Sequence, residues 1–258
     1  MVYLIISLLA SVAGAICGIG GGVIIKPVLD LFQLGSASSI SFLSSCTVLS
    51  MSLYSVGKSV LSGEKTVNAK VGTPLAIGAA LGGLVGKYLF TCIEGLFPSS
   101  EGVRAVQASC LALVTLFTLV YTLLRHKTHS YHISSPFCCI CIGLVLGLIS
   151  SFLGIGGGPI NLAVLFFFFS MDTKTAAANS LYIILVSQIA SLLLTLFSDR
   201  VPEFEWAALL FMILGGICGG IIGRSLCKRI PSRIVNALFI GLMGVIICIS
   251  IFNICNCL

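Results

Sequence analysis

Eight apolar runs, most of them close to the length that crosses a bilayer, follow one another along this sequence. They cover residues 2–33, 38–60, 69–93, 103–124, 137–170, 175–197, 205–227 and 234–255. About 20 apolar residues in a helix span the hydrocarbon core of a membrane. Helices satisfy their backbone polar groups internally, whereas an open sheet edge in lipid does not. We therefore expect an all-α polytopic integral membrane protein in which every run is helical.

The balance of apolar and charged residues excludes a soluble globular domain. The 258 residues are 58% hydrophobic and 9% charged, with a mean hydropathy of +1.16. Globular proteins have roughly 45–50% apolar and about 25% charged residues. The formal charge of +6 comes from cations near the ends of the apolar runs, with no basic stripe for a phosphate backbone. We expect the lipid bilayer as a partner and no nucleic acid.

The sequence contains an internal repeat. Gly-Ile-Gly-Gly-Gly occupies residues 18–22 and again residues 154–158, an offset of 136. A second element, GAALGGLVGKYL from Gly78, matches GGICGGIIGRSL from Gly215 at an offset of 137, with Lys87 and Arg224 in equivalent places. Two motifs at nearly one offset indicate a duplication. We predict two homologous halves of four segments each, residues 1–124 and 137–258, joined by a polar linker at 125–136.

A glycine-rich element that closes the first apolar segment of each half, with Pro27 after the first copy, resembles the sulfite exporter TauE/SafE family of membrane permeases. The resemblance covers essentially the whole chain. It implies a permease that moves small, often sulfur-containing anions, such as sulfite and organosulfonates, across the bacterial inner membrane. The second copy departs from the first, since Pro159 follows it directly and Ala163 stands where Pro27 has its counterpart.

The two GIGGG elements are predicted to break their helices. Each glycine costs a helix interior about 1 kcal/mol relative to alanine. A helix that restarts after such a break presents free N–H groups and its positive dipole end, which suit a small anion. The alternative is that these glycines only allow close helix packing, the role we expect for the elements at Gly78 and Gly215. The predicted substrate-binding glycines are Gly18, Gly20, Gly21, Gly22, Gly154, Gly156, Gly157 and Gly158.

Polar side chains near the breaks are the other candidate substrate-binding residues. Lys26 lies four residues after Gly22, and a cation at membrane depth suggests function. Its alternative role is a helical pair with Asp30. Asn161 follows the second break by three residues. A stripe of hydroxyl groups runs along 38–59 and a similar one along 180–195, and these stripes contribute Ser44, Ser45, Asn179 and Ser180 to the candidates.

The segments 2–33 and 137–170 are long enough to fold back as hairpins. A single helix of 32 residues would run about 48 Å, against a hydrocarbon core of about 30 Å. If every segment crosses once, the cations split six against seven between the two sides. If both segments are hairpins, ten cations lie inside against three outside (Lys87, Arg104 and Arg200), as the positive-inside rule requires. We therefore expect the two halves to be inverted repeats, which suits alternating access.

Three functions remain in order of preference. The first is a secondary transporter for a small anion in the inner membrane, with an unidentified coupling ion. The second is a passive anion channel that uses the same broken helices. The third is a membrane thiol–disulfide electron carrier, suggested by Cys138 and Cys141, although no cysteine pair is duplicated between the halves. No histidine falls inside a predicted span to act as a base, so we expect no enzyme, and no cofactor or metal.

Overall fold

The computed structural model describes residues 1–63, 67–94, 100–124, 131–133, 135–155, 157–198 and 201–257. Within these ranges the chain forms ten helices and no strand, which confirms the predicted all-α class. The helices are α1 (Val2–Cys17), α2 (Gly22–Leu31), α3 (Ala37–Leu61), α4 (Ala69–Glu94), α5 (Ser100–Leu124), α6 (Pro136–Phe152), α7 (Pro159–Phe169), α8 (Thr173–Phe197), α9 (Trp206–Arg229) and α10 (Ser232–Cys257).

Six of the described helices, α3, α4, α5, α8, α9 and α10, are long and apolar enough to cross a membrane. Their bounds lie within a few residues of the apolar runs predicted from the sequence. Large apolar side chains on their outer faces are exposed, such as Leu81 and Val85 on α4. In water such surfaces would be an aggregation hazard, whereas in lipid they are the expected covering. The protein is therefore a multi-pass membrane protein.

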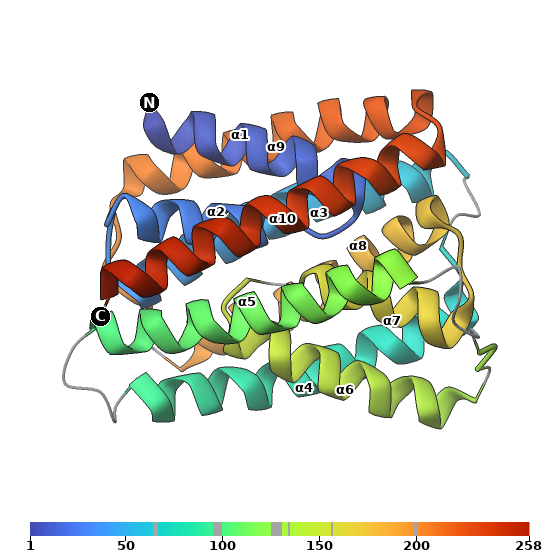
Figure 1. The fold of residues 1–258 in the computed structure, drawn as a ribbon, viewed down its shortest axis with the longest axis horizontal. Coiled ribbons are helices and arrows are strands. Elements are labelled where there is room, and N and C mark those ends of the chain that lie inside the picture. The colour runs from blue at the N-terminus through green and yellow to red at the C-terminus, as the bar shows by residue number, and fades with distance from the viewer. Residues whose placement is uncertain are drawn as a thin grey trace.

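The four shorter helices form two hairpins. Tyr3, at the start of α1, donates from its hydroxyl to the carbonyl of Leu34, just beyond α2, at 3.2 Å. Before α6, the N–H of Tyr131 donates to the carbonyl of Phe167 in α7 at 2.7 Å. Each pair of helices therefore returns to the side from which it came. Figure 1 shows α1 and α2 making this excursion from the left of the bundle and α6 and α7 making it from the right.

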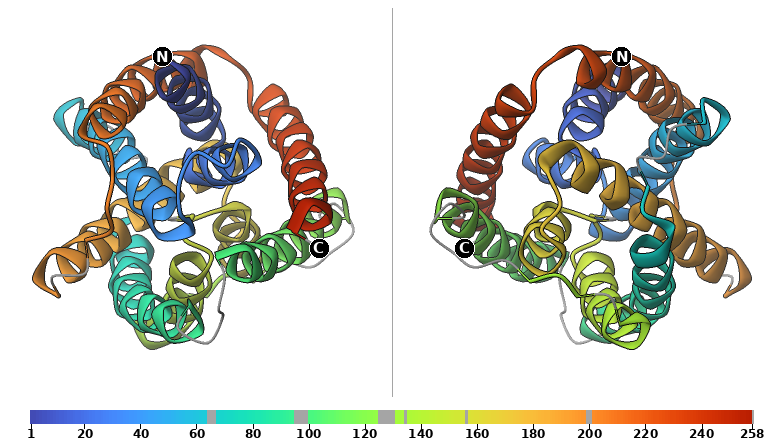
Figure 2. Two further views of the ribbon diagram at one scale, coloured as in Figure 1. Left: turned by 90° about the vertical axis from the view of Figure 1, so that its left-hand side faces the viewer. Right: turned by 90° about the vertical axis from the view of Figure 1, so that its right-hand side faces the viewer.

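Most of the helix packing joins the first half of the sequence to the second. The helix α4 packs against α6 and α8, α9 packs against α1 and α3, and α5 packs against α10. Viewed end on, the short helices α2 and α7 lie toward the middle, with the longer helices around them (Figure 2). Most of α2 and α7 is accordingly buried.

The glycines of the element at Gly78 provide the contact between α4 and α6. A Cβ at Gly78, Gly82 or Gly86 would overlap a carbonyl oxygen of α6, at Ile140, Leu144 and Leu148 respectively. On the other side of the protein, a Cβ at Gly219 would lie 2.5 Å from Cβ of Ser11 on α1. Both contacts are close backbone approaches of the small-residue kind. The predicted packing role of these two elements is confirmed.

Side chains cap α3 and α8 at equivalent places in the two halves. Ser36 Oγ accepts a hydrogen bond from the N–H of Ser39 at 3.1 Å. Asp172, 136 residues later, accepts from the N–H groups of Lys174 at 3.2 Å and Thr175 at 3.3 Å. Partial burial alone would raise the pKa of Asp172, but the hydrogen bonds from Thr175 and Lys174 favour the carboxylate and lower the pKa below its ordinary value.

Candidate functional site

Each GIGGG element separates two helices. Residues 18–22 follow α1 and lead into α2, and residues 154–158 lie between α6 and α7. The helix α1 ends at Cys17, where Gly18 has a φ of 77° and its N–H donates to the carbonyl of Gly14 at 2.8 Å. The helix α6 ends at Phe152, and Gly154 has a φ of 64°. This left-handed conformation favours glycine, which has no Cβ to clash with the following carbonyl. Gly156 lies outside the described residues.

The two interruptions contact each other inside the protein. A Cβ at Gly22 would overlap the carbonyl oxygen of Ile155, and a Cβ at Gly158 would lie 3.4 Å from Cγ2 of Val23. The structure thus brings together two elements that are 136 residues apart in the sequence. The candidate glycines that it describes lie at or beside this contact.

An apolar layer surrounds the contact between the interruptions. A Cβ at Gly20 would lie 3.3 Å from Cδ1 of Ile184 on α8 and 3.6 Å from Cγ1 of Val48 on α3. A Cβ at Gly157 would overlap Ile184 Cγ1. The side chains of Val48, Ile184, Ile19 and Ile155 are all buried. We call these four residues the apolar layer.

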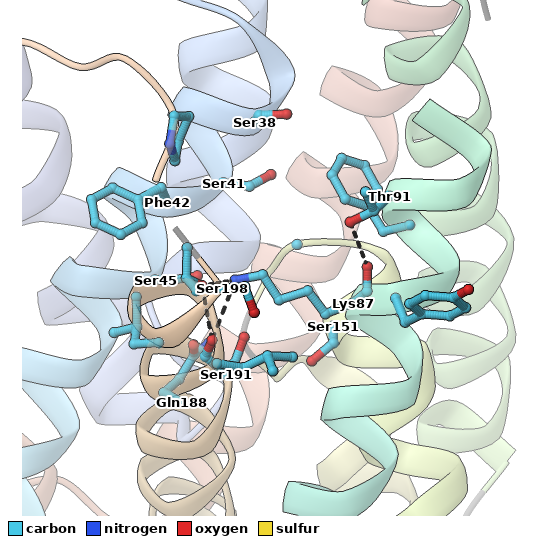
Figure 3. A pocket seen from close by; sticks show the side chains of 17 residues that line it. Ser38, Ser41, Phe42, Ser45, Lys87, Thr91, Ser151, Gln188, Ser191 and Ser198 are labelled. Atoms are coloured by element: carbon cyan, nitrogen blue, oxygen red, sulfur yellow. Dashed lines mark hydrogen bonds between the residues drawn. The ribbon is translucent and has the colours of Figure 1, made fainter. Parts of the chain in front are cut away.

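A cavity of about 460 Å³, lined by both polar and apolar side chains, lies between α3, α4 and α8 (Figure 3). At about 30 Å³ for each water molecule, this volume holds a small ion and several waters. Hydroxyl and amide groups from α3 and α8 line it, together with one cation from α4 and the backbone of Gly154. We call it the Lys87 cavity, and its polar lining includes Ser38, Ser41, Ser45, Lys87, Gln188 and Ser191.

Lys87 extends from α4 across this cavity to α8, as Figure 3 shows. Its ammonium donates to the carbonyl of Ser191 at 3.3 Å and to the hydroxyl of Thr195. In the sequence, Lys87 stands at the end of an apolar segment beside the packing glycines of the Gly78 element, which did not mark it as a site residue. Its equivalence with Arg224 was the signal that could have marked it as a site residue.

A second cavity, of about 360 Å³, lies at the other end of α3 and α8. Its cations are Lys174, Arg224 and Lys228, and α3 contributes the hydroxyl residues Ser55 and Ser59. Arg224 donates to the carbonyl of Ser55 at 2.6 Å. We call it the Arg224 cavity.

The two cavities approach the apolar layer from opposite ends. The Lys87 cavity uses residues 38–45 of α3 and 188–195 of α8, whereas the Arg224 cavity uses residues 55–59 of α3 and 177–181 of α8. The predicted stripe of hydroxyl groups on α3 is thus divided between the two cavities. Val48 and Ile184 fall between the two sets of lining residues on their helices.

Lys26 is buried, with 3% of its surface exposed, and its hydrogen bonds link the end of α6, before the second interruption, to α3 and α5. Its ammonium donates to Ser41 Oγ at 2.9 Å, to Gln107 Oε1 at 2.6 Å and to the carbonyl of Leu153 at 2.8 Å. The last bond places a positive charge at the carboxyl end of α6, where the helix dipole favours a cation. A Cβ at Gly154 would lie 2.7 Å from Lys26 Nζ, so this ammonium lies against the backbone of Gly154, a residue that lines the Lys87 cavity.

Gln107 on α5, which sequence analysis did not select, completes this arrangement. Its amide nitrogen donates to the carbonyl of Phe152 at 2.8 Å while its oxygen accepts from Lys26. The two carbonyls at the end of α6 therefore each have a side-chain donor from the first half. No repeat or motif marked Gln107 in the sequence.

The remaining polar candidates divide into two groups. Ser44 Oγ, Asn161 Oδ1 and Ser180 Oγ are buried and have no hydrogen-bond partner among the described residues. Ser44 Oγ lies 3.0 Å from the Cβ position of Gly22, and Asn161 Nδ2 lies 3.5 Å from that of Gly157, so both border the interruptions. Asn179 is instead engaged in structure, because it accepts from the N–H of Asn68 at 3.0 Å and donates to the carbonyl of Thr175 at 2.8 Å. Ser45 lines the Lys87 cavity.

The cysteines of the redox alternative lie away from both cavities. Cys138 and Cys141 are exposed on α6, and neither lines the Lys87 cavity or the Arg224 cavity.

Three histidines lie in the predicted linker 125–136. His126 and His129 lie outside the described residues, and His132 Nδ1 is 3.5 Å from Ser170 Oγ. The described residues contain no group of three His, Cys, Asp or Glu side chains arranged to hold a metal ion.

The sequence of this chain matches the model of a known protein family. The family model described as sulfite exporter TauE/SafE matches residues 3–250. The chain belongs to the sulfite exporter TauE/SafE family. The resemblance found in the sequence is confirmed, and the TauE/SafE relatives below are named as membrane transporters rather than enzymes.

The TauE/SafE chain is similar to curated proteins from several bacteria. It is 24% identical over 261 residues to the probable membrane transporter protein YunE of Bacillus subtilis, covering 91% of both chains. It is 24% identical over 272 residues to the probable membrane transporter protein MamO of Magnetospirillum gryphiswaldense, covering 93% of this chain and 43% of MamO. A probable membrane transporter protein of Xylella fastidiosa is 28% identical over 180 residues, 68% of this chain and 67% of the relative. No solved structure matches this TauE/SafE chain.

Proposed function

We propose that this protein is a secondary transporter that carries a small oxyanion across the inner membrane by alternating access. The observation that carries the proposal is the pair of cavities at opposite ends of α3 and α8, with Val48 and Ile184 between the two sets of lining residues on these helices. Alternating access needs one central site, reached from either side in turn. The layer at the two interruptions is where we place that site.

The substrate would bind between the restarted helices α2 and α7. Their first turns follow Gly21 and Gly158, and N–H groups at a helix start favour an anion. The hydroxyls of Ser44 and Ser180, buried without a partner among the described residues, can donate further hydrogen bonds to the anion, and the amide nitrogen of Asn161, beside Gly157, can donate another. Burying such atoms unpaired costs about 1–3 kcal/mol each, so a ligand that engages them gains binding energy. The family description suggests sulfite, an organosulfonate or a related sulfur-containing anion.

The two halves, residues 1–124 and 137–258, would be inverted membrane repeats joined by the linker 125–136. Opposite hairpins at α1–α2 and α6–α7 support this arrangement (Figure 1), as do the equivalent caps Ser36 and Asp172. Exchange of conformation between two such halves would close one cavity and open the other. The apolar layer favours this mechanism over a passive channel, because a channel needs a continuous polar path.

The test is transport by the purified protein in proteoliposomes. Radiolabelled sulfite, sulfate, thiosulfate and methanesulfonate are offered in turn, with empty liposomes as the control. We expect saturable uptake of at least one of these anions and acceleration by the same anion preloaded inside. Flux that rises linearly with concentration and ignores the preloaded anion would establish the channel instead. Reduction of an external disulfide without any anion flux would support the electron carrier.

A further inference from the structure

We propose that Lys87 and Arg224 are paired anion-capture residues, one in each cavity, which exchange a bond to a helix carbonyl for a bond to the substrate. This inference rests on the proposed function and adds to it the residues that receive the anion on each side. Each of the two cations lines one cavity, and each extends from a helix of one half to a helix of the other.

The bonds made by the two cations are equivalent under the repeat. Lys87 on α4 donates to the carbonyl of Ser191 on α8, and Arg224 on α9 donates to the carbonyl of Ser55 on α3. The two cations are 137 residues apart and the two serines are 136 apart. If the bond served only local stability, nothing would require both its donor and its acceptor to recur at the equivalent positions of the other repeat. Its recurrence at opposite ends of the protein indicates one function carried out on both sides.

The chemistry of these bonds suits exchange with an anion. The acceptors are neutral oxygens, the carbonyls of Ser191 and Ser55 and the hydroxyl of Thr195, so an anion that replaces one of them adds an attraction between opposite charges that these bonds lack. None of the described residues that line either cavity is acidic. Hydroxyl groups beside each cation, at Ser45 and Ser59, can donate to further substrate oxygens. An oxyanion that enters either cavity thus finds a cation and neighbouring donors.

Exchange of partners would also couple binding to movement. While Lys87 holds the carbonyl of Ser191, α4 is tied to α8 near the mouth of its cavity. When the anion takes this ammonium, the tie is released and α8 becomes free to shift against α4. The same event at Arg224 would release α3 from α9. A substrate can shift a conformational equilibrium only through such differential contacts.

The experiment measures transport from each side separately. Proteoliposomes with the protein in one orientation, established by impermeant thiol labelling, are assayed for uptake and efflux of radiolabelled sulfite. Loss of a hydrogen bond to a charged group predicts that Lys87→Gln raises KM about ten-fold for sulfite presented at the Lys87 cavity. KM at the opposite face should change little. Arg224→Gln should do the reverse, and the exposed Lys58→Gln, outside both cavities, should change neither.

A second variant separates a lost charge from a lost fold. In a cysteine-depleted background, Lys87→Cys should lose capture at its own face, and aminoethyl methanethiosulfonate applied there should restore it by replacing the ammonium. A neutral methanethiosulfonate of the same size should not. Equal changes at both faces, lower thermal stability with unaltered KM, or failure of the charged reagent to rescue would overturn the proposal. A wild-type protein that carries none of the anions would instead refute the proposed function itself.

Discussion

Val48 and Ile184 stand 136 residues apart in the chain, and their side chains lie beside the same glycine, within 3.3–3.6 Å of where a Cβ of Gly20 would be. One comes from α3 and the other from α8, at the same offset as the two GIGGG elements. On these helices they fall between the residues that line the Lys87 cavity and those that line the Arg224 cavity. A barrier at these two side chains is open to direct test.

Truncating two side chains of the apolar layer should convert saturable transport into a non-saturating leak. The double variant Val48→Ala with Ile184→Ala removes branched side chains from both sides of Gly20 and should join the two cavities through water. We expect a non-saturating sulfite flux in proteoliposomes above the wild-type rate. The neighbouring Ile183→Ala also truncates a buried branched side chain, at a cavity cost of about 2–5 kcal/mol, but Ile183 is not among the atoms nearest to the Cβ position of Gly20, so the flux should stay saturable. Equal leak in both variants would mean that Val48 and Ile184 are not the barrier.

Replacing Lys26 should disturb the second interruption. Lys26→Met leaves the carbonyl of Leu153 and the oxygen of Gln107 without this donor, a loss of roughly 2–3 kcal/mol for hydrogen bonds to a charged group. We expect lower thermal stability in detergent and loss of sulfite uptake. Lys26→Arg should retain part of both, since it keeps the charge and the donors.

Pairing with Asp30 would give a different result for Lys26. If that pair were the main role of Lys26, the double variant Lys26→Met with Asp30→Leu would transport normally. We expect the double variant to be as impaired as Lys26→Met, because it does not replace the donor to Leu153. Uptake and thermal unfolding of the three variants, measured side by side, decide between the two roles.

The interruptions should not tolerate a side chain where glycine has a positive φ. A Cβ at Gly18 would overlap Ala177, and a Cβ at Gly157, where φ is 137°, would overlap Ile184. Gly18→Ala and Gly157→Ala should therefore each abolish uptake, from either half, because the proposed site needs both interruptions. Gly21 has a φ of −65° and only moderate crowding, so Gly21→Ala should be milder.

Variants at two further glycines serve as controls, one for backbone strain and one for helix packing. Gly63 has a φ of 65°, and apart from its chain neighbours no described residue has an atom within 4 Å of its Cβ position, so Gly63→Ala should add mainly backbone strain and should preserve uptake. Gly82→Ala disturbs the contact of α4 with Leu144 and should mainly lower thermal stability. Wild-type uptake by Gly157→Ala would refute a site at the interruptions.

The inverted arrangement predicts which chain positions share a side of the membrane. Single cysteines at Ser62, after α3, and at Ser232, at the start of α10, should react with an impermeant maleimide only from the cytoplasmic side. A cysteine at Ser198, after α8, should react from the other side. All three residues are exposed, so their reactivity reports on topology rather than burial. Ser62 and Ser232 on opposite sides would exclude inverted halves.

The cap at Asp172 should give a stability contribution that depends on pH. Because the folded pKa of Asp172 is lowered, its stabilisation is complete above the unfolded pKa of about 4 and is lost as pH falls through the folded value. Asp172→Ala should cost about 1 kcal/mol at pH 7 and less at pH 3. Asp172→Asn, which can still cap, should cost little at pH 7. Thermal unfolding in detergent at both pH values provides the measurement, and a constant difference for Asp172→Ala would contradict the assignment.

The helices and the packing glycines were predictable because their signals are local. A run of about 20 apolar residues has few structural options in lipid, and glycines four residues apart share one helix face. The contacts of the candidate site were harder to predict. Asn179 stood beside the hydroxyl stripe of its segment, but the structure uses its amide to hold Asn68. Which neighbour a side chain meets depends on packing between helices, which a helical period does not specify.

The sequence by itself determined the membrane class, the repeated elements and the family, because hydropathy, spacing and motif are properties of residues close together in the chain. Only the tertiary structure decided that Lys26 reaches the carbonyl of Leu153, 127 residues away, and that Lys87 and Arg224 cross between halves to line opposite cavities. These contacts depend on how α4 meets α8 and how α9 meets α3. That choice follows from the combined burial of many side chains, so no single segment of the sequence contains it.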